Sequence, residues 1–168
     1  NSGATPSTPK QMVFAQYLRS ELEQLGFQEI SLDENGYLFA TWPANTDKPV
    51  PTIGFIAHMD TVSDFCDHEI HPIITENYDG GELTLGTSGL ILNPKEFPHL
   101  AELKGRTLIT SDGTTILGAD DKAGIAEVLT VVEEILTDGT PHGKICIGFT
   151  PDEEIARGAK HFDVEGFG

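Results

Sequence analysis

Three adjacent carboxylates follow a strand-like run in "ICIGFTPDEE", where six residues typical of a buried strand lead into Asp152, Glu153 and Glu154. Neighbouring like charges repel one another, so a fold that gathers them at a strand end needs something that offsets the repulsion. Water around a solvated loop does so at little cost, because it screens the charges. A cation held among the carboxylates does so as well. Taken alone, this segment favours the solvated loop.

Two other segments carry comparable groups. His58 and Asp60 follow the apolar run "PTIGFIA", and Asp120 and Asp121 lie in "LGADDKAG", where a predicted helix begins. Carboxylates at a helix start gain from the helix dipole and the free backbone N–H groups, so capping alone accounts for both aspartates. A His-x-Asp pair often occurs by chance, and a histidine at a strand end is more often simply hydrogen-bonded. Each segment by itself is therefore a weak signal.

Together the three segments predict one metal site. In open α/β sheets, ligands bind at the edge where the strands end, and both apolar runs end in such residues. Imidazole and carboxylates without thiolates suit Zn²⁺ or a related divalent ion. We expect His58 to supply a nitrogen ligand, with Asp60 on the same side holding the other ring nitrogen. Of Glu153 and Glu154, one is expected to bind metal, which leaves the other free for proton transfer.

The elements that position these groups follow from hydrophobic periodicity. Apolar residues at helical spacing predict helices over 9–25 and 121–136. "QEISL" and "GYLFATW", joined through Asn35-Gly36, predict a hairpin, and 51–57 and "KICIGFT" predict buried strands. This order predicts an α/β fold with a mixed, largely parallel sheet flanked by helices.

The segment from 61 to 117 is rich in Gly and Pro and divides into short strand-like pieces such as "HPIIT" and "ELTLG". "RTLIT" and "TTILG" flank Ser111-Asp112-Gly113, which predicts a second hairpin. A length of 168 residues gives no reason to expect two complete domains.

Composition excludes several classes of function. The chain has 38% apolar and 22% charged residues, as ordinary globular proteins do. Its formal net charge of −17 works against binding nucleic acid or anionic membranes. No apolar run approaches the roughly 20 residues that cross a bilayer, and no signal-peptide pattern opens the chain. Cys66 and Cys146 do not make a disulfide framework, and two free thiols favour a reducing compartment such as the cytoplasm.

The motifs resemble those of a known enzyme family. His58-Met59-Asp60-Thr61, "GADDKAG" and "TPDEE" are similar to the motifs of the di-zinc metallopeptidases, which include carboxypeptidases and deacylases. The chain from Pro6 onward also resembles the peptidase T family in segments that the wider group does not require: "ENYDGGELTLG", "FPHL", "LITSDGTT" and "GAKHFDVE". This resemblance implies a cytoplasmic tripeptide aminopeptidase, a hydrolase that releases the N-terminal residue of tripeptides.

The resemblance also implies a role for each motif residue. His58 matches a ligand of one zinc ion, Glu154 a ligand of the other, and Asp120 the carboxylate that bridges both. Asp60 matches the residue that orients the histidine, and Glu153 matches the general base of a reaction carried out by a zinc-bridged hydroxide. The family further implies a cis peptide after Asp120.

Two zinc ions with three protein ligands each and one shared carboxylate need five residues, and the motifs supply three. The resemblance implies that the others, an acidic residue and a histidine, follow Gly168. We therefore expect residues 1–168 to form part of a catalytic domain, incomplete at both ends, without the last catalytic strands and the lid domain through which a homodimer would form. By itself this piece is expected to bind zinc weakly and to be inactive.

Two alternatives remain open. One is a dipeptidase, carboxypeptidase or deacylase of the same family, which the similarity of 61–117 to the peptidase T family disfavours. The other is a non-catalytic relative that binds metal or peptide, which the intact motifs disfavour.

Overall fold

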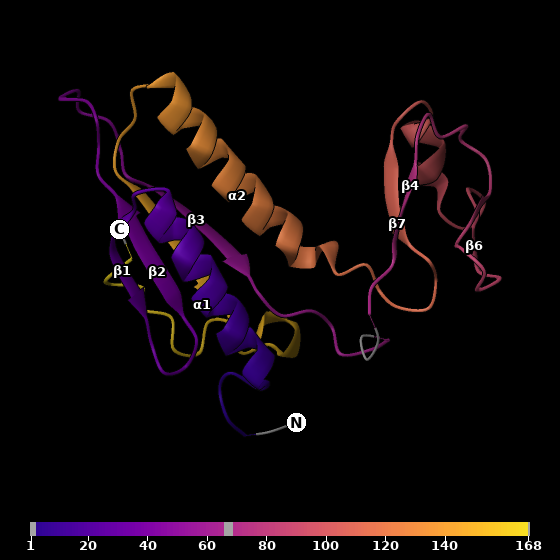
Figure 1. The fold of residues 1–168 in the computed structure, drawn as a ribbon, viewed down its shortest axis with the longest axis horizontal. Helices are drawn as coiled ribbons and strands as arrows, with labels where there is room; N and C mark the ends of the chain where they lie inside the picture. Colours follow the sequence, from indigo (N-terminus) through magenta and orange to yellow (C-terminus); the bar gives the residue numbers. More distant parts are fainter. Residues whose placement is uncertain (1–2, 66–68, 168) are drawn as a thin grey trace. The chain divides into compact units, whose positions relative to one another are not determined.

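The computed structural model describes residues 3–65 and 69–167 (Figure 1). The chain divides into two compact units: residues 1–61 with 119–168 form the first unit, and residues 62–118 form the second. Cys66 lies outside the described residues, whereas Cys146 is a buried free thiol. All of the predicted site residues belong to the first unit.

The first unit is built on a four-stranded sheet with the strand order β1-β2-β8-β3. Its strands are β1 (Gln28–Leu32), β2 (Leu38–Trp42), β3 (Ile53–His58) and β8 (Ile145–Thr150). The predicted Asn35-Gly36 hairpin joins β1 and β2, and Gly36 has the positive φ of 88° that favours glycine at such a turn.

The α/β class and the mixed sheet are confirmed, but among these four strands the sheet is not largely parallel. β1 and β2 pair antiparallel, β2 and β8 also pair antiparallel, and only β3 and β8 are parallel. The reason is the β1–β2 hairpin. It reverses the chain before β2, so β2 runs antiparallel to β1, and β2 also runs antiparallel to its other neighbour, β8.

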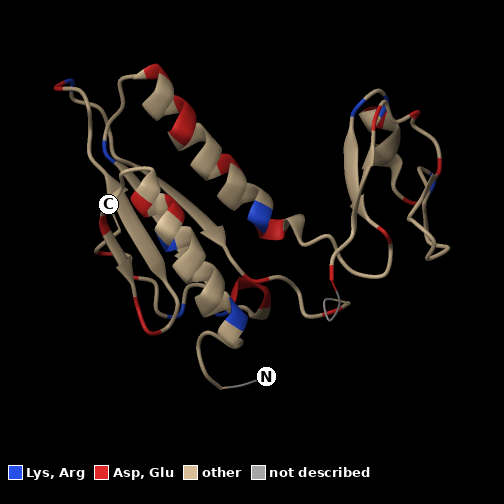
Figure 2. Cartoon of the chain, viewed as in Figure 1, with Lys and Arg blue, Asp and Glu red and all other residues tan. Residues whose placement is uncertain are grey.

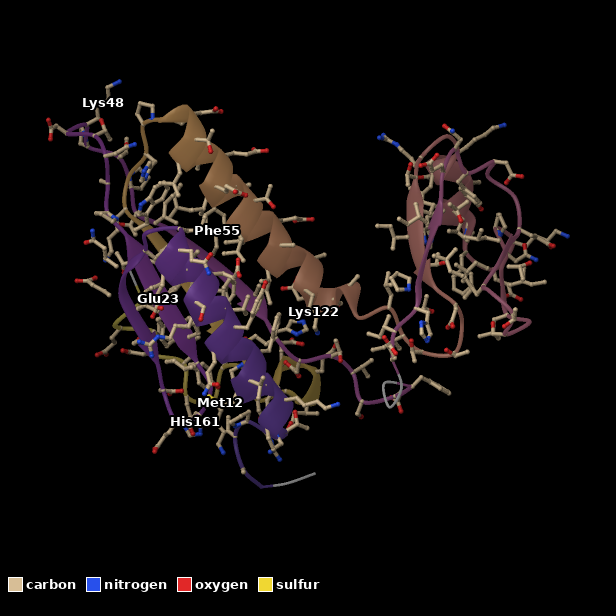
Figure 3. The ribbon with its side chains drawn as sticks, viewed as in Figure 1. Met12, Glu23, Lys48, Phe55, Lys122 and His161 are labelled. Atoms are coloured by element: carbon tan, nitrogen blue, oxygen red, sulfur yellow. The ribbon has the colours of Figure 1, made fainter. Side chains whose placement is uncertain are left out.

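Both long helices pack on one face of this sheet (Figure 1). α1 (Pro9–Gln24) and α2 (Ala119–Asp138) confirm the two predicted helices, although Asp120 and Asp121 at the start of α2 have non-helical torsions. Phe55, labelled in Figure 3, packs partly buried against the same core. The buried apolar side chains of the two helices are Ala15, Leu18, Leu22, Ile125 and Val132.

The opposite face of the sheet is covered in part by aromatic rings from the end of the chain. A Cβ on Gly54 would lie 2.7 Å from the Phe167 ring, and one on Gly148 would lie 3.1 Å from it, so the glycines allow this close approach. Phe162 stacks edge-on against both Phe39 and Phe167 with ring centroids 5.1 Å apart in each case. Helices therefore cover one face of the sheet and aromatic side chains the other.

The two strands predicted as buried differ in the structure. All six residues of β8 are buried, because it lies between β2 and β3. β3 lies at the edge of the described sheet, and Ile53 and Ile56 are 50% and 57% exposed. The prediction of a buried strand is thus right for β8 and wrong for the first part of β3.

The second unit contains two small antiparallel pairs. β4 (Pro72–Thr75) pairs with β7 (Leu108–Ser111), β5 (Leu83–Thr84) pairs with β6 (Ile91–Leu92), and a 3₁₀ helix, η1, spans Pro98–Leu103. The hairpin predicted around Asp112 is wrong. Asp112 does form a local turn, since its carboxylate accepts hydrogen bonds from Thr114, but "TTILG" forms no strand and β7 finds its partner more than 30 residues earlier.

Within the described part of the chain, neither helix combines the length and the apolar character that a bilayer span requires.

Candidate metal centre

The parallel pairing of β3 and β8 brings two of the predicted motifs to one place. His58, the last residue of β3, lies opposite Thr150, the last residue of β8. The chain after each strand therefore leaves the sheet at the same edge, and Glu153 and Glu154 follow in η2 (Glu153–Ile155), a short 3₁₀ turn. Asp and Glu residues mark this turn and the start of α2 in red in Figure 2.

His58, Asp120 and Glu154 meet at this edge. His58 Nε2 lies 2.9 Å from Asp120 Oδ1, and one ligand atom from each of the three side chains lies within 4.8 Å of the others. One imidazole nitrogen and two carboxylate oxygens match the donors of a zinc site. The three residues predicted as metal ligands are thus close enough to bind one ion together.

Asp60, two residues after His58, orients the imidazole ring for this role. His58 Nδ1 lies 3.0 Å from the backbone oxygen of Asp60 and 3.5 Å from the Asp60 carboxylate. A carbonyl oxygen can only accept a hydrogen bond, so Nδ1 carries a proton and Nε2 is the atom available to a metal. The carbonyl of Asp60, rather than its predicted carboxylate, makes the closer contact.

The Asp60 carboxylate instead holds the turn after β8. It accepts hydrogen bonds from the backbone N–H groups of Glu153, at 2.9 Å, and Glu154, at 3.1 Å. Asp60 therefore ties the imidazole on β3 to the turn that carries both glutamates.

Asp120 and Asp121 point in different directions, and the peptide between them is cis, as the resemblance implied. Asp121 turns back into the protein, where it accepts hydrogen bonds from Gly124 N–H at 3.1 Å and His58 N–H at 3.4 Å. The Asp120 side chain is 85% exposed and faces His58. Sequence reasoning offered capping for both residues, whereas in the structure only Asp121 caps the helix.

Glu153 lies beside the three clustered side chains. Its Oε2 is 3.8 Å from His58 Nε2, and its side chain is 56% exposed. It contributes to a cavity of about 370 Å³ that His58, Asp120 and Asp121 also line. A carboxylate that borders the cluster and remains open to solvent is well placed to exchange protons with a molecule bound there.

The charges of the site act on His58. Burial of the imidazole lowers its pKa, but the hydrogen bonds to Asp120 and the Asp60 carbonyl, with the charges of Asp60 and Glu153, outweigh burial and hold the pKa of His58 above its ordinary value. The same negative field favours a bound divalent cation.

Lys122, labelled in Figure 3 near the start of α2, is a neighbour of the site that the sequence did not single out. Its Nζ donates to the Met59 carbonyl at 3.2 Å and lies 5.8 Å from the Phe14 ring centroid. Burial lowers the pKa of Lys122, while the charge of Asp60 opposes that shift.

Asp152, the first of the three adjacent carboxylates, does not lie in a solvated loop, because it is fully buried. It accepts hydrogen bonds from Ser7 and Gln11, residues before and within the first turn of α1. Burial raises the pKa of Asp152, but the hydrogen bonds from Ser7 and Gln11 lower it more, so its pKa lies below the usual value. One feature of the sequence could have indicated a buried polar partner for α1: Gln11 lies on the same helical face as the apolar residues Ala15, Leu18 and Leu22, and all four are buried.

The histidines outside the motifs lie away from the cluster or on the surface where the structure describes them. His142 stacks on Trp42 with centroids 4.2 Å apart, and His161 lies edge-on to Tyr37. His71 and His99 are exposed, and His68 lies outside the described residues. Across residues 3–65 and 69–167, the cluster of His58, Asp120 and Glu154 is the group that could hold a metal ion.

The chain is similar to several known proteins in sequence and in fold. No family model matches the chain. A peptidase T from Brevibacillus brevis is 53% identical over 169 residues, which cover 99% of this chain and 41% of that protein. The crystal structure of aminopeptidase PepT from Bacillus cereus superposes with a TM-score of 0.67 at 30% identity and covers 96% of this chain and 36% of that one. A tripeptidase from Staphylococcus aureus gives a TM-score of 0.66 at 29% identity, covering 96% of this chain and 37% of that one.

The share of each chain that the alignment covers is as informative as the sequence identity. The chain spans about two fifths of the length of the curated relatives it matches, and those relatives match it along 99% of its own length or more. The fold and this continuous similarity point the same way: along its whole length the chain is similar to peptidase T, at about 53% identity.

Proposed function

We propose that this chain forms part of the active site of a metal-dependent aminopeptidase that releases the N-terminal residue of tripeptides. The observation that carries the proposal is the meeting of His58, Asp120 and Glu154 at one sheet edge, with Glu153 beside them. The names of the relatives support the reaction class, since they are called peptidase T, aminopeptidase and tripeptidase.

In this proposal the metal is zinc: His58 Nε2 would hold one ion, the Glu154 carboxylate would hold a second, and Asp120 would serve both. When bound, such a metal lowers the pKa of a coordinated water to about 7 and polarises the carbonyl of the scissile bond. A complete site with two ions needs five ligands, so two more would come from outside residues 1–168, which form part of the catalytic domain.

The chain's own residues then have distinct tasks. Asp60 keeps the proton of His58 on Nδ1 and holds the turn that bears both glutamates. The Glu153 carboxylate accepts a proton from the attacking water and returns it to the leaving amine. It can do so because it borders the cluster but does not belong to the group of ligand atoms that includes Glu154. The exposed side of Glu153 and the neighbouring cavity give a peptide access to this carboxylate.

The proposal extends to the surroundings of the protein. The buried free thiol of Cys146 suits a reducing compartment, so we place the protein in the cytoplasm. Dimerisation, in this proposal, uses segments beyond residues 1–168 and makes a homodimer.

A substrate comparison tests the proposed reaction. The intact protein that contains this chain is incubated with tripeptides, dipeptides and N-acyl amino acids, and the released N-terminal residue is measured. We expect tripeptides to be cleaved fastest, activity to disappear on chelation, and Zn²⁺ to restore it. Faster cleavage of dipeptides or N-acyl amino acids would assign the protein to another branch of the family, and metal binding without any hydrolysis would indicate a binding protein.

A further inference from the structure

The buried carboxylate of Asp152 lies next to the proposed catalytic glutamates and takes no part in the mechanism so far. Its side chain is completely buried and belongs to the residue just before Glu153. A buried charge is costly unless it is fully hydrogen-bonded, and a neutral residue in a plain turn would avoid that cost. The contacts of Asp152 therefore indicate a specific role.

Residues at the start of α1 hold Asp152 in place by hydrogen bonds. Ser7 N–H donates to both carboxylate oxygens at 2.9 Å, Ser7 Oγ donates to Oδ1 at 2.6 Å, and Gln11 Nε2 donates to Oδ1 at 2.8 Å. In return, the backbone N–H of Asp152 donates to Gln11 Oε1 at 3.0 Å. The Gln11 amide thus holds both the side chain and the backbone of Asp152.

These hydrogen bonds stabilise a turn of the backbone at Asp152. Asp152 has φ 57° and ψ 28°, in the left-handed region that residues other than glycine rarely adopt and that Asp and Asn tolerate best. The turn redirects the chain at the end of β8, so that Glu153 and Glu154 face His58 instead of continuing along the strand. Hydrogen bonds between the Gln11 amide and both the side chain and the backbone N–H of Asp152 oppose any relaxation of this conformation.

The glutamate turn is consequently held from two sides. The Asp60 carboxylate binds the backbone N–H groups of Glu153 and Glu154 from the β3 side, and Gln11 and Ser7 bind Asp152 from the α1 side. Gln11 and Ser7 do not belong to the group of His58, Asp120 and Glu154 that could hold a metal.

We propose that Gln11, with Ser7, acts through Asp152 as a positioning device that sets the direction of Glu153 and Glu154. The inference rests on the proposed function for its kinetic consequence, because it assumes that Glu153 moves a proton and Glu154 binds metal. Displacing a reacting group by about 1 Å costs on the order of 100-fold in rate, so a small rotation of this turn has a measurable effect.

The test compares Gln11→Leu with the matched control Gln16→Leu in the intact protein. Both changes remove an amide from α1, but Gln16 is exposed, whereas Gln11 is the glutamine that hydrogen-bonds Asp152. At a temperature where circular dichroism shows both variants folded, we expect Gln11→Leu to lower kcat for a tripeptide by about 10- to 100-fold, with KM changed less than about threefold. Its dissociation constant for Zn²⁺, measured by competition with a chelating dye, should rise by about threefold or more.

Equal kcat and equal Zn²⁺ affinity in the two variants would overturn the proposal. A purely structural role would lower the melting temperature of Gln11→Leu but leave kcat per folded, metal-loaded molecule unchanged, and that result would overturn it too. If Gln11→Leu does not fold, Asp152→Asn replaces it, since this variant keeps the side-chain size and the backbone contact with Gln11, and the same losses are expected. If the wild-type protein hydrolyses no tripeptide, the proposed function fails, and the Zn²⁺ comparison alone decides the positioning role.

Discussion

Glu153 and Glu154 are chemically identical neighbours with different surroundings, and the proposed function gives them different tasks. Glu154 belongs to the group of three ligand atoms, whereas the Glu153 carboxylate lies 3.8 Å from His58 and is largely exposed. Replacing Glu153 by Gln in the intact protein should keep Zn²⁺ binding and reduce kcat by about 100- to 10,000-fold, because the amide cannot take up the proton.

Kinetics with a tripeptide and metal analysis of the same sample check this expectation. Glu134→Gln, an exposed change on α2, serves as the control and should match the wild type. Near-normal turnover by Glu153→Gln would show that another group is the base.

Asp120 and Asp121 provide a second contrast between adjacent residues. Asp120→Asn should weaken Zn²⁺ binding by about tenfold or more, because it removes a charged ligand. Asp121→Asn keeps an acceptor for Gly124 N–H, so we expect a metal affinity close to that of the wild type and a loss of about 1 kcal/mol or less in the free energy of unfolding. Titration calorimetry and urea denaturation measure the two quantities, and the reverse order of effects would contradict the assignment.

The sequence allowed the closeness of the three candidate ligands to be predicted but not the residues that hold them. His58, Asp120 and Glu154 each follow a strand or begin a helix, and such positions converge by a general rule of α/β sheets. Asp152 was misjudged because a run of acidic residues in a sequence gives no sign of a partner. Its partners, Ser7 and Gln11, lie 145 and 141 residues earlier in the chain.

At the scale of elements, α1 contributes both packing and positioning. Its buried stripe of Ala15, Leu18 and Leu22 packs into the core of the first unit, while Val13 is 67% exposed. Leu22→Ala should lower the free energy of unfolding by about 2–5 kcal/mol, because it leaves a cavity in a packed core.

Val13→Ala on the same helix is the control and should stay within about 0.5 kcal/mol of the wild type. Urea denaturation followed by circular dichroism compares the two variants. Equal destabilisation by both changes would show that α1 does not pack through the face described here.

Helices were easier to predict than the sheet. Regular spacing of apolar residues gave both α1 and α2, since one helical face meets the core. The place of each strand in the sheet could not be predicted in this way. The apolar runs of β3 and β8 look alike in the sequence, although β3 lies at an edge and β8 is central. Which strands become neighbours depends on the hairpin β1–β2 and its pairing with β8, a contact more than 100 residues apart in the sequence.

At the scale of the whole molecule, the chain consists of two units with different predictability. In the second unit the short strands were expected, but the partner of β7 was not, because β4 lies far upstream and a local turn suggested a nearer partner. The net charge of −17 works against binding nucleic acid.

Residues 1–168 alone should show no measurable hydrolysis of tripeptides, because in the two-ion proposal they would supply only three of the five ligands needed. An assay of this piece beside the intact protein, at equal concentration and with added Zn²⁺, measures the difference. Comparable turnover by both would mean that the three residues suffice and that the two-ion proposal is wrong.

The most direct test of the account asks whether His58, Asp120 and Glu154 belong to one metal centre. Zn²⁺ binding to the intact protein is measured by equilibrium dialysis for the wild type, for each single alanine variant of these residues, and for His99→Ala, an exposed histidine of the second unit. We predict that each of the three changes weakens binding by about tenfold or more and that His99→Ala leaves it unchanged. Wild-type affinity in any of the three variants would contradict the metal centre on which the proposed function rests.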